Sequence, residues 1–171
     1  MRIYIACALT HVPRGPVFDE HVSFIHQLAE NLKMNGHEVK YALVDSDPQL
    51  DSRPFDERAR LCYLWDRSMV EEAELMIAEA SWASTGLGIE MQIAENKGIP
   101  IIVCFKDFQI NRVKTVTYEN PDHTSHHLQV GDGIITLMAL GVPNIFRLIE
   151  YFSPDDGVAQ IIGALDVLDR Q

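Results

Sequence analysis

The chain has 171 residues, an apolar share of 47% and a formal net charge of −11, which predict one globular domain over residues 1–171. The negative charge argues against nucleic acid polymers and anionic membranes as partners, whereas a small anion is still allowed because a site can be locally positive. No stretch approaches the ~18 apolar residues of a membrane span. The first residues are too short and strand-like for a signal peptide.

The three cysteines are widely spaced and lie in or beside apolar runs, at Cys7, Cys62 and Cys104. Such spacing is not that of a disulfide framework, so we expect reduced thiols in a cytoplasmic protein.

The first half of the chain alternates apolar runs with residues at helical spacing. Gly36 stands where a helix commonly ends, and prolines and a glycine break the chain after the first apolar run. In order, we expect a strand at 3–8, a loop at 10–16, a helix at 17–35, a strand at 37–44, a loop at 45–54 and a helix at 55–72.

The second half continues this alternation, apart from one long irregular insertion. Ser153 and Pro154 carry the signature of a helix start, with acidic residues directly after them. We expect a strand at 75–78, a helix after the stretch 79–90, a strand at 101–105, an irregular inserted loop at about 106–133, a short helix at 134–140, a strand at 145–151 and a last helix from 153.

Strands that are continuously apolar and alternate with helices are typical of a parallel sheet covered on both faces. The sequence therefore predicts an α/β fold, a doubly wound sheet of about five parallel strands. Ligands of such sheets bind beyond the carboxyl ends of the strands. The segments 4–10 and 81–90 and the loop after Phe105 should all reach that edge.

The stretch from Glu79 to Glu90 is the strongest functional candidate. Gly86 and Gly88 let the backbone approach a ligand, and Ser84 supplies a hydroxyl near a helix N-terminus, which favours anions or sugar oxygens. Glu90 should fall in about the first helical turn, where the helix dipole would keep its carboxylate ionised at neutral pH. Such a carboxylate is a candidate nucleophile. The alternative is an ordinary strand-to-helix junction with a glutamate that only complements the dipole.

Three other groups of residues have competing interpretations. Asp66 lies near the apolar face of its helix and needs either a partner, such as Arg67 or Arg60, or a chemical role. The histidines at 123, 126 and 127 fit no zinc spacing and indicate a solvated loop, so we expect no metal site and no cofactor. His11 and Arg14 could meet a phosphate or simply lie in an exposed loop. Gly86-Leu87-Gly88-Ile89-Glu90-Met91 lacks the third glycine of a dinucleotide fingerprint.

Taken in order, several short motifs resemble the nucleoside 2-deoxyribosyltransferases and their relatives, the 2′-deoxynucleoside 5′-monophosphate N-glycosidases. The resemblance is firm over residues 1–10 and 60–105 and weaker over 134–152. The motifs are Tyr4-Ile5-Ala6, Asp66 with Met69-x-x-x-Ala73-Glu74, Ala78-Glu79, Ser84-x-Gly86-x-Gly88-x-Glu90, Ala94-x-x-x-Gly98-Ile99-Pro100-Ile101 and Thr136-Leu137-Met138-x-x-Gly141.

The resemblance implies a flavodoxin-like fold, a homodimer or larger assembly, and a covalent glycosyl–enzyme mechanism. It places the nucleophile at Glu90, the aspartate that meets the base at Asp66 and the tyrosine that steadies the nucleophile at Tyr4. It places the group that meets the sugar 5′ position at Ser84 and a residue donated across the subunit interface at Thr136. We add Thr10, Gly86 and Gly88 as substrate-binding candidates.

Two departures from the family pattern bear on the substrate. Ser84 stands where transferases of free nucleosides tend to have an acid, and a hydroxyl tolerates a phosphate that an acid would repel. However, Ala8 and Thr10 stand where the monophosphate hydrolases carry a serine and an arginine. Three questions therefore stay open: whether the substrate is a free nucleoside or a 5′-monophosphate, whether the reaction is hydrolysis or transfer, and which base is preferred.

With these residues, the resemblance implies an enzyme that cleaves or exchanges the N-glycosidic bond of a 2′-deoxynucleoside or its 5′-monophosphate through Glu90. The alternatives are a hydrolase specific for 5′-monophosphates, or a nucleotide-sensing domain that kept the pocket without turnover.

Overall fold

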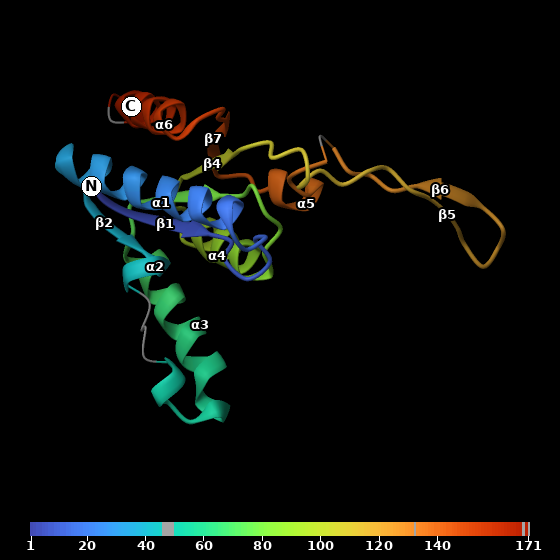
Figure 1. Cartoon of the computed structure of the whole chain (residues 1–171), viewed down its shortest axis with the longest axis horizontal. Helices are drawn as coiled ribbons and strands as arrows, with labels where there is room; N and C mark the ends of the chain where they lie inside the picture. The colour runs from blue at the N-terminus through green and yellow to red at the C-terminus, as the bar shows by residue number, and fades with distance from the viewer. Residues whose placement is uncertain (46–49, 132, 169, 171) are drawn as a thin grey trace.

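The computed structural model describes residues 1–45, 50–131, 133–168 and 170. Its centre is a five-stranded parallel sheet in the order β2-β1-β3-β4-β7 (Figure 1). The strands are β1 Arg2–Cys7, β2 Glu38–Tyr41, β3 Leu75–Glu79, β4 Ile101–Phe105 and β7 Ile145–Glu150. The helices are α1 Pro16–Met34, α2 Ala42–Asp45, α3 Phe55–Glu72, α4 Thr85–Asn96, α5 Leu137–Leu140 and α6 Pro154–Leu168, with a 3₁₀ turn at Leu50–Ser52.

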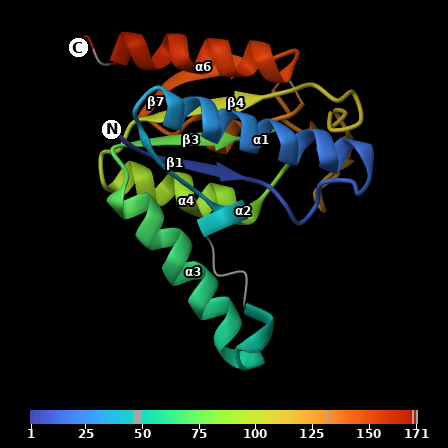
Figure 2. The same ribbon diagram turned by 60° about the vertical axis from the view of Figure 1, so that its left-hand side comes forward.

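Helices cover both faces of the sheet, because successive side chains of a buried strand point to opposite sides. Ile3 and Ile5 of β1 pack in one core with α1 and α6. Tyr4 and Ala6 point the other way, into a second core with α3 and α4. Figure 2 shows α1 and α6 on one side of the strands and α4 on the other. The predicted flavodoxin-like, doubly wound fold is therefore confirmed.

The strand order reverses between β1 and β3, because the chain after β1 turns to α1 on one face and the chain after β3 turns to α4 on the other. Cys7 at the end of β1 is in register with Glu79 at the end of β3, and Glu79 is in register with Cys104 of β4. The carboxyl ends of three strands thus lie side by side at the switch point, which is where such folds bind ligands.

The second strand is shorter than predicted. It ends at Tyr41, and residues 42–45 form the short helix α2. The Tyr41 backbone N–H donates to the Asp45 carboxylate at 2.9 Å, which caps this turn, and Leu43 packs against the core from a helical position. The rest of the predicted loop at 45–54 contains residues 46–49, which lie outside the described part of the chain.

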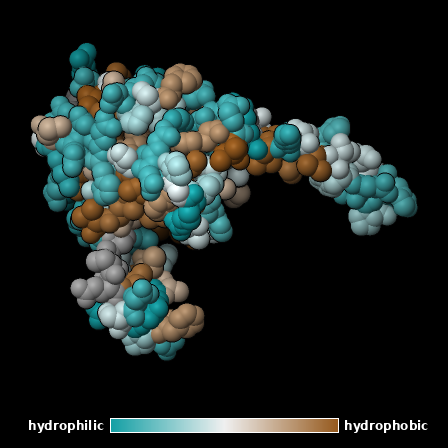
Figure 3. All heavy atoms as spheres, in the orientation of Figure 1, coloured by the Kyte–Doolittle hydropathy of each residue, from teal (hydrophilic) through white to brown (hydrophobic). Residues whose placement is uncertain are grey.

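The insertion after β4 is a projecting arm, not an irregular loop throughout. It contains an antiparallel hairpin of β5 Thr117–Glu119 and β6 Ser125–His127. The two limbs meet at the base, where the Val113 N–H donates to the Gly133 carbonyl at 2.7 Å. Figure 3 shows apolar side chains along the stem and polar ones at the tip. Strands β5 and β6 were not predicted, because they are short and polar and lack alternating apolar residues.

Helix α3 has the predicted bounds but also stands away from the body at its N-terminal end (Figure 2). Its buried residues are Met69 and Val70, both in its last two turns. Among the described residues, no helix is long and apolar enough to cross a membrane. Cys7, Cys62 and Cys104 are all free thiols in the structure.

Candidate active site

The site is built around the start of α4. Strand β3 is buried along its whole length, and residues 80–84 connect it to α4. Ser84 is the N-cap, and its Oγ accepts the Leu87 N–H at 3.3 Å. The prediction that a Ser84 hydroxyl lies at a helix N-terminus is confirmed.

Glu90 and Tyr4 form a buried pair between α4 and β1. The Tyr4 hydroxyl donates to Glu90 Oε1 at 2.6 Å, across from β1 to α4. Tyr4 is fully buried, and Glu90 is 8% exposed. Burial and the Glu90 carboxylate raise the pKa of the Tyr4 phenol, so the phenol stays a donor.

The predicted environment of Glu90 is wrong in one respect. Glu90 lies in the second turn of α4, and the first turn holds no acidic residue. Because helix-dipole stabilisation fades beyond the first turn, it does not offset the cost of burying the charge. Burial raises the pKa of Glu90 to about 7, with the Tyr4 hydrogen bond lowering it and the Asp66 charge raising it. Both protonation states are therefore populated at neutral pH, whereas the sequence predicted a fully ionised group.

Asp66 and Glu90 line the same cavity, between α3 and α4. The cavity has a volume of about 320 Å³. The Cys62 thiol, one turn before Asp66 on α3, donates to Asp66 Oδ2 at 3.4 Å. Burial and the Asp66 charge raise the pKa of Cys62 to about 11, so the thiol remains protonated and able to donate. Arg67, one of the suggested partners of Asp66, donates to Glu71 at 2.9 Å.

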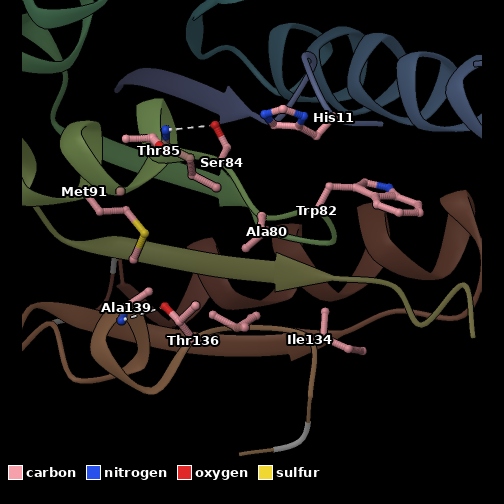
Figure 4. A pocket seen from close by; sticks show the side chains of 13 residues that line it. His11, Ala80, Trp82, Ser84, Thr85, Met91, Ile134, Thr136 and Ala139 are labelled. Carbon is pink, nitrogen blue, oxygen red and sulfur yellow. Dashed lines mark hydrogen bonds between the residues drawn. The ribbon is translucent and has the colours of Figure 1, made fainter. Parts of the chain in front are cut away.

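Ser84 and Thr136 line a second cavity, of about 360 Å³. Thr136 is the N-cap of α5, and its Oγ1 accepts the Ala139 N–H at 3.4 Å (Figure 4). Figure 4 shows His11 and Ser84 on one side of this cavity and Thr136 on the other. The remaining wall is mostly apolar, from Ala80, Trp82, Leu87, Met91, Ile134, Ile135 and Ala139.

The structure thus places most of the predicted site residues in two groups, on either side of the start of α4. Gly86 lines the cavity of Glu90 and Asp66, and Gly88 lines the cavity of Ser84 and Thr136. A Cβ at Gly88 would meet no atom within 4 Å, and one at Gly86 would meet only Ser84 Oγ, at 3.7 Å. Both glycines therefore leave open space beside the helix.

The loop after β1 places only some of its candidates at the site. His11 lines the Ser84 cavity, whereas the Arg14 guanidinium lies over the Phe18 ring at 4.4 Å. Thr10 is exposed and, in the described part of the chain, is not among the residues that line either cavity. The three histidines at 123, 126 and 127 lie on the hairpin, away from both cavities, and are exposed.

The sequence reasoning missed Cys62, Trp82 and a buried group around Glu79. Cys62 could have been found, because a residue four positions before Asp66 shares its helix face. Glu79 also carried a signal, since an acid that ends an otherwise apolar strand must have partners when it is buried. Trp82 packs with Phe108, whose place depends on the inserted arm and could not be inferred.

Comparisons with known proteins bear on both the fold and the family. No protein-family model matches this chain. A protein of Syntrophotalea carbinolica, provisionally named 2′-deoxynucleoside 5′-phosphate N-hydrolase 1, is 33% identical over 63 residues. That match covers 37% of this chain and 44% of the relative, so the chain matches less than half of the relative's length.

Two solved structures share the fold over nearly the whole chain. The CMP N-glycosidase of Clostridium botulinum has a TM-score of 0.55 at 16% identity, covering 95% of this chain and 98% of that one. A conserved protein from Enterococcus faecalis has a TM-score of 0.60 at 16% identity, covering 95% and 97%. At this identity the two structures show the fold alone. With the shared fold, the sequence match confirms the resemblance of this chain to the nucleoside 2-deoxyribosyltransferase family and its related N-glycosidases.

Proposed function

We propose that the chain is an enzyme that cleaves or exchanges the N-glycosidic bond of a 2′-deoxynucleoside or its 5′-monophosphate, with Glu90 as the nucleophile. The observation that carries the proposal is the Tyr4–Glu90 hydrogen bond, which holds a buried carboxylate at the wall of a cavity that also contains Asp66. The name of the matched relative, an N-hydrolase of 2′-deoxynucleoside 5′-phosphates, supports this class of substrate.

The chemistry follows from the charge that develops on the sugar. As the bond between C1′ and the base nitrogen breaks, C1′ becomes positive, and the Glu90 carboxylate stabilises it and then bonds to it through oxygen. Asp66 faces the departing base and must carry a proton at this step, which its carboxyl group gives to the base nitrogen. Water, or a second base, then displaces Glu90 from C1′ and gives its proton back to Asp66, and two displacements at one carbon give net retention.

Tyr4 has a defined part in this scheme. Its hydroxyl donates to the Glu90 oxygen at 2.6 Å, so it fixes the carboxylate in one rotamer and favours its ionised form. The second Glu90 oxygen is left to attack. Ser84 and the cavity around it would hold the 5′ end of the substrate, with Gly86 and Gly88 allowing the sugar to lie close to the helix.

The test is base release or exchange from the four deoxynucleosides and their four 5′-monophosphates, followed by chromatography. Glu90→Gln keeps the size of the side chain and its ability to accept from Tyr4 but removes the nucleophile. We expect it to lower turnover by several orders of magnitude, or more than about 4 kcal/mol in the barrier. Glu95→Gln, on the same helix, is the matched control and should retain wild-type turnover. A trapped 2-fluoro glycosyl adduct should map to the peptide that contains Glu90.

The proposal fails if the wild type releases and exchanges no base from any of the eight compounds, or if Glu90→Gln retains more than about a tenth of the activity, a barrier change of only ~1.4 kcal/mol.

A sensing domain is the second candidate, and one observation favours it. Glu90 and Ser84 line separate cavities, so a nucleotide could bind at Ser84 without reaching the nucleophile. Calorimetry separates the two functions. Tight nucleotide binding without product after long incubation would support the sensor, and steady product formation would exclude it.

A further inference from the structure

A second buried acid, Glu79, lies at the end of β3 and has no part in the scheme above. Its side chain and that of His21 on α1 are both fully buried. Glu79 Oε1 accepts two hydrogen bonds, one from the Ser81 hydroxyl and one from the Tyr151 hydroxyl at 3.0 Å. Ser81 Oγ in turn accepts the Lys106 backbone N–H at 2.7 Å.

His21 connects this group to the end of β1. Its Nε2 lies 2.9 Å from the Ala8 carbonyl oxygen, and because a carbonyl only accepts, Nε2 must carry a proton and donate. His21 Nδ1 then faces Glu79 Oε2 at 3.4 Å. Within the described residues, neither of these two atoms has a hydrogen-bond partner by strict geometry, so they have only each other.

Two bare lone pairs facing each other in a buried site would repel, whereas one proton between them makes the contact favourable. The proton can sit on Nδ1, giving an ion pair, or on Oε2, giving a neutral pair. In either arrangement Glu79 and His21 together hold one proton beyond that on Nε2. Burial raises the pKa of Glu79, and the His21 charge and the two hydroxyl donors lower it.

We propose that Glu79 and His21 form a proton-sharing positioning pair that fixes the wall of the Ser84 cavity for substrate. The pair joins segments at the ends of four strands: Ala8 after β1, Ser81 after β3, Lys106 after β4 and Tyr151 after β7. The first two segments continue directly into the cavity wall, through His11 and through Trp82 and Ser84.

The root of the arm is tied to the same group. Asn111 Nδ2 donates to the Ser81 carbonyl at 2.8 Å and to the Lys106 carbonyl at 2.9 Å. Among the described residues, neither Glu79 nor His21 lines the cavity, so the pair acts on the cavity wall without touching a ligand. Because it is a positioning device, its loss should weaken substrate binding much more than it slows the chemical step at Glu90.

The experiment compares Glu79→Ala with Glu79→Gln and rests on the proposed function for its kinetic readout. Glutamine keeps the oxygen that accepts from Ser81 and Tyr151, and its amide N–H2 supplies a fixed donor toward His21 Nδ1. We expect Glu79→Ala to raise KM by at least about tenfold, equivalent to about 1.4 kcal/mol, with kcat changed much less. Glu79→Gln should restore KM to near the wild-type value.

A second readout needs no turnover. The chain has two tryptophans, Trp65 and Trp82, so in a Trp65→Phe background the emission reports on Trp82 in the cavity wall. Glu79→Ala should increase acrylamide quenching of Trp82, and Glu79→Gln should not. If the wild type releases no base, the proposed function fails, and quenching still decides on the positioning pair.

Three results would overturn the inference. A folded Glu79→Ala protein with wild-type KM and quenching would do so, as would Glu79→Gln behaving like Glu79→Ala. Should Glu79→Ala fail to fold, Ser81→Ala is the milder variant, since it breaks only the link from Lys106 to Glu79. It should raise KM and Trp82 quenching, and wild-type values for both would reject the pair.

Discussion

Glu90 is held between two protonation states by opposing contacts. Burial and Asp66 favour the neutral acid, and the Tyr4 hydroxyl favours the carboxylate, with the result that the pKa is about 7. Because only the carboxylate is a nucleophile, kcat/KM should rise with pH through about 7. Tyr4→Phe removes the contact that lowers this pKa, so the rising limb should move to higher pH. A pH–rate profile of both proteins checks this. If the rising limb of Tyr4→Phe lies at the same pH as that of the wild type, Tyr4 does not affect the ionisation of Glu90.

The same burial makes Glu90 a pH-dependent cost to stability. The pKa in the folded chain, about 7, lies above the ordinary 4.5, so the folded state binds more protons in between. The stability that comes with the neutral form is complete below pH 4.5 and is lost as pH rises through 7. The pKa difference corresponds to about 3 kcal/mol. Glu90→Gln cannot ionise, so its free energy of unfolding should exceed that of the wild type by up to this amount at pH 8 and by little at pH 4.5.

Urea unfolding of the two proteins at a series of pH values measures this difference. If the difference in free energy of unfolding between Glu90→Gln and the wild type stays constant from pH 4.5 to 8, Glu90 is not a buried carboxylate with a raised pKa. Glu95→Gln serves as the control for removing one acid from α4.

At the scale of elements, glycine at the start of α4 lowers the stability of the helix but leaves open space in the cavity beside it. Gly88 has no positive φ angle, and its added Cβ would meet no atom, so packing does not require glycine there. Gly88→Ala should therefore stabilise the chain by about 0.5–1 kcal/mol. The same methyl group would enter the Ser84 cavity and should raise KM.

Gly163 of α6 is the matched control for this substitution. A Cβ there would also meet nothing within 4 Å, and Gly163 lies outside both cavities of the site. Gly163→Ala should raise the melting temperature without altering KM. If Gly88→Ala leaves KM unchanged as well, the Ser84 cavity does not hold the substrate.

The elements that could be predicted are those specified by local signals. Helix α3 has its predicted bounds because a proline precedes it and apolar spacing runs to its last turn. Strand β2 ended early because a side chain, Asp45, capped a turn that competes with the strand. The site shows the same division. Tyr4, Asp66, Ser84 and Glu90 were assigned from motifs, whereas the pKa of Glu90 depends on burial by distant segments, which sequence spacing does not reveal.

At the scale of the whole molecule, the homodimer or larger assembly that the family resemblance implies would place α5 at a subunit interface through Thr136. Met138, two residues on, is 88% exposed, although it is a large apolar side chain. The wild type should therefore have a light-scattering mass of at least about twice 19.3 kDa. Met138→Glu should shift the mass toward the monomer and lower activity, if Thr136 completes the neighbour's site.

Met34 at the end of α1 gives the control, since it is 75% exposed and lies far along the chain from α5. Met34→Glu should leave the mass and the activity unchanged. A fully active monomer at micromolar concentration would rule out a shared site.

The arm also determines where the chain can change length. Its limbs are closed on each other at the base, by Val113 to Gly133 at 2.7 Å and by Val116 to Leu128 at 2.9 Å. A Cβ at Gly133 would lie 2.8 Å from the Val113 carbonyl oxygen, so this glycine is needed to bring the limbs together. Beyond that junction, residues can be added or removed with little loop-closure penalty, because closure entropy grows slowly with length. The hairpin tip is therefore the natural point to graft a tag or a second domain onto this fold, and the place where homologous chains should differ most in length.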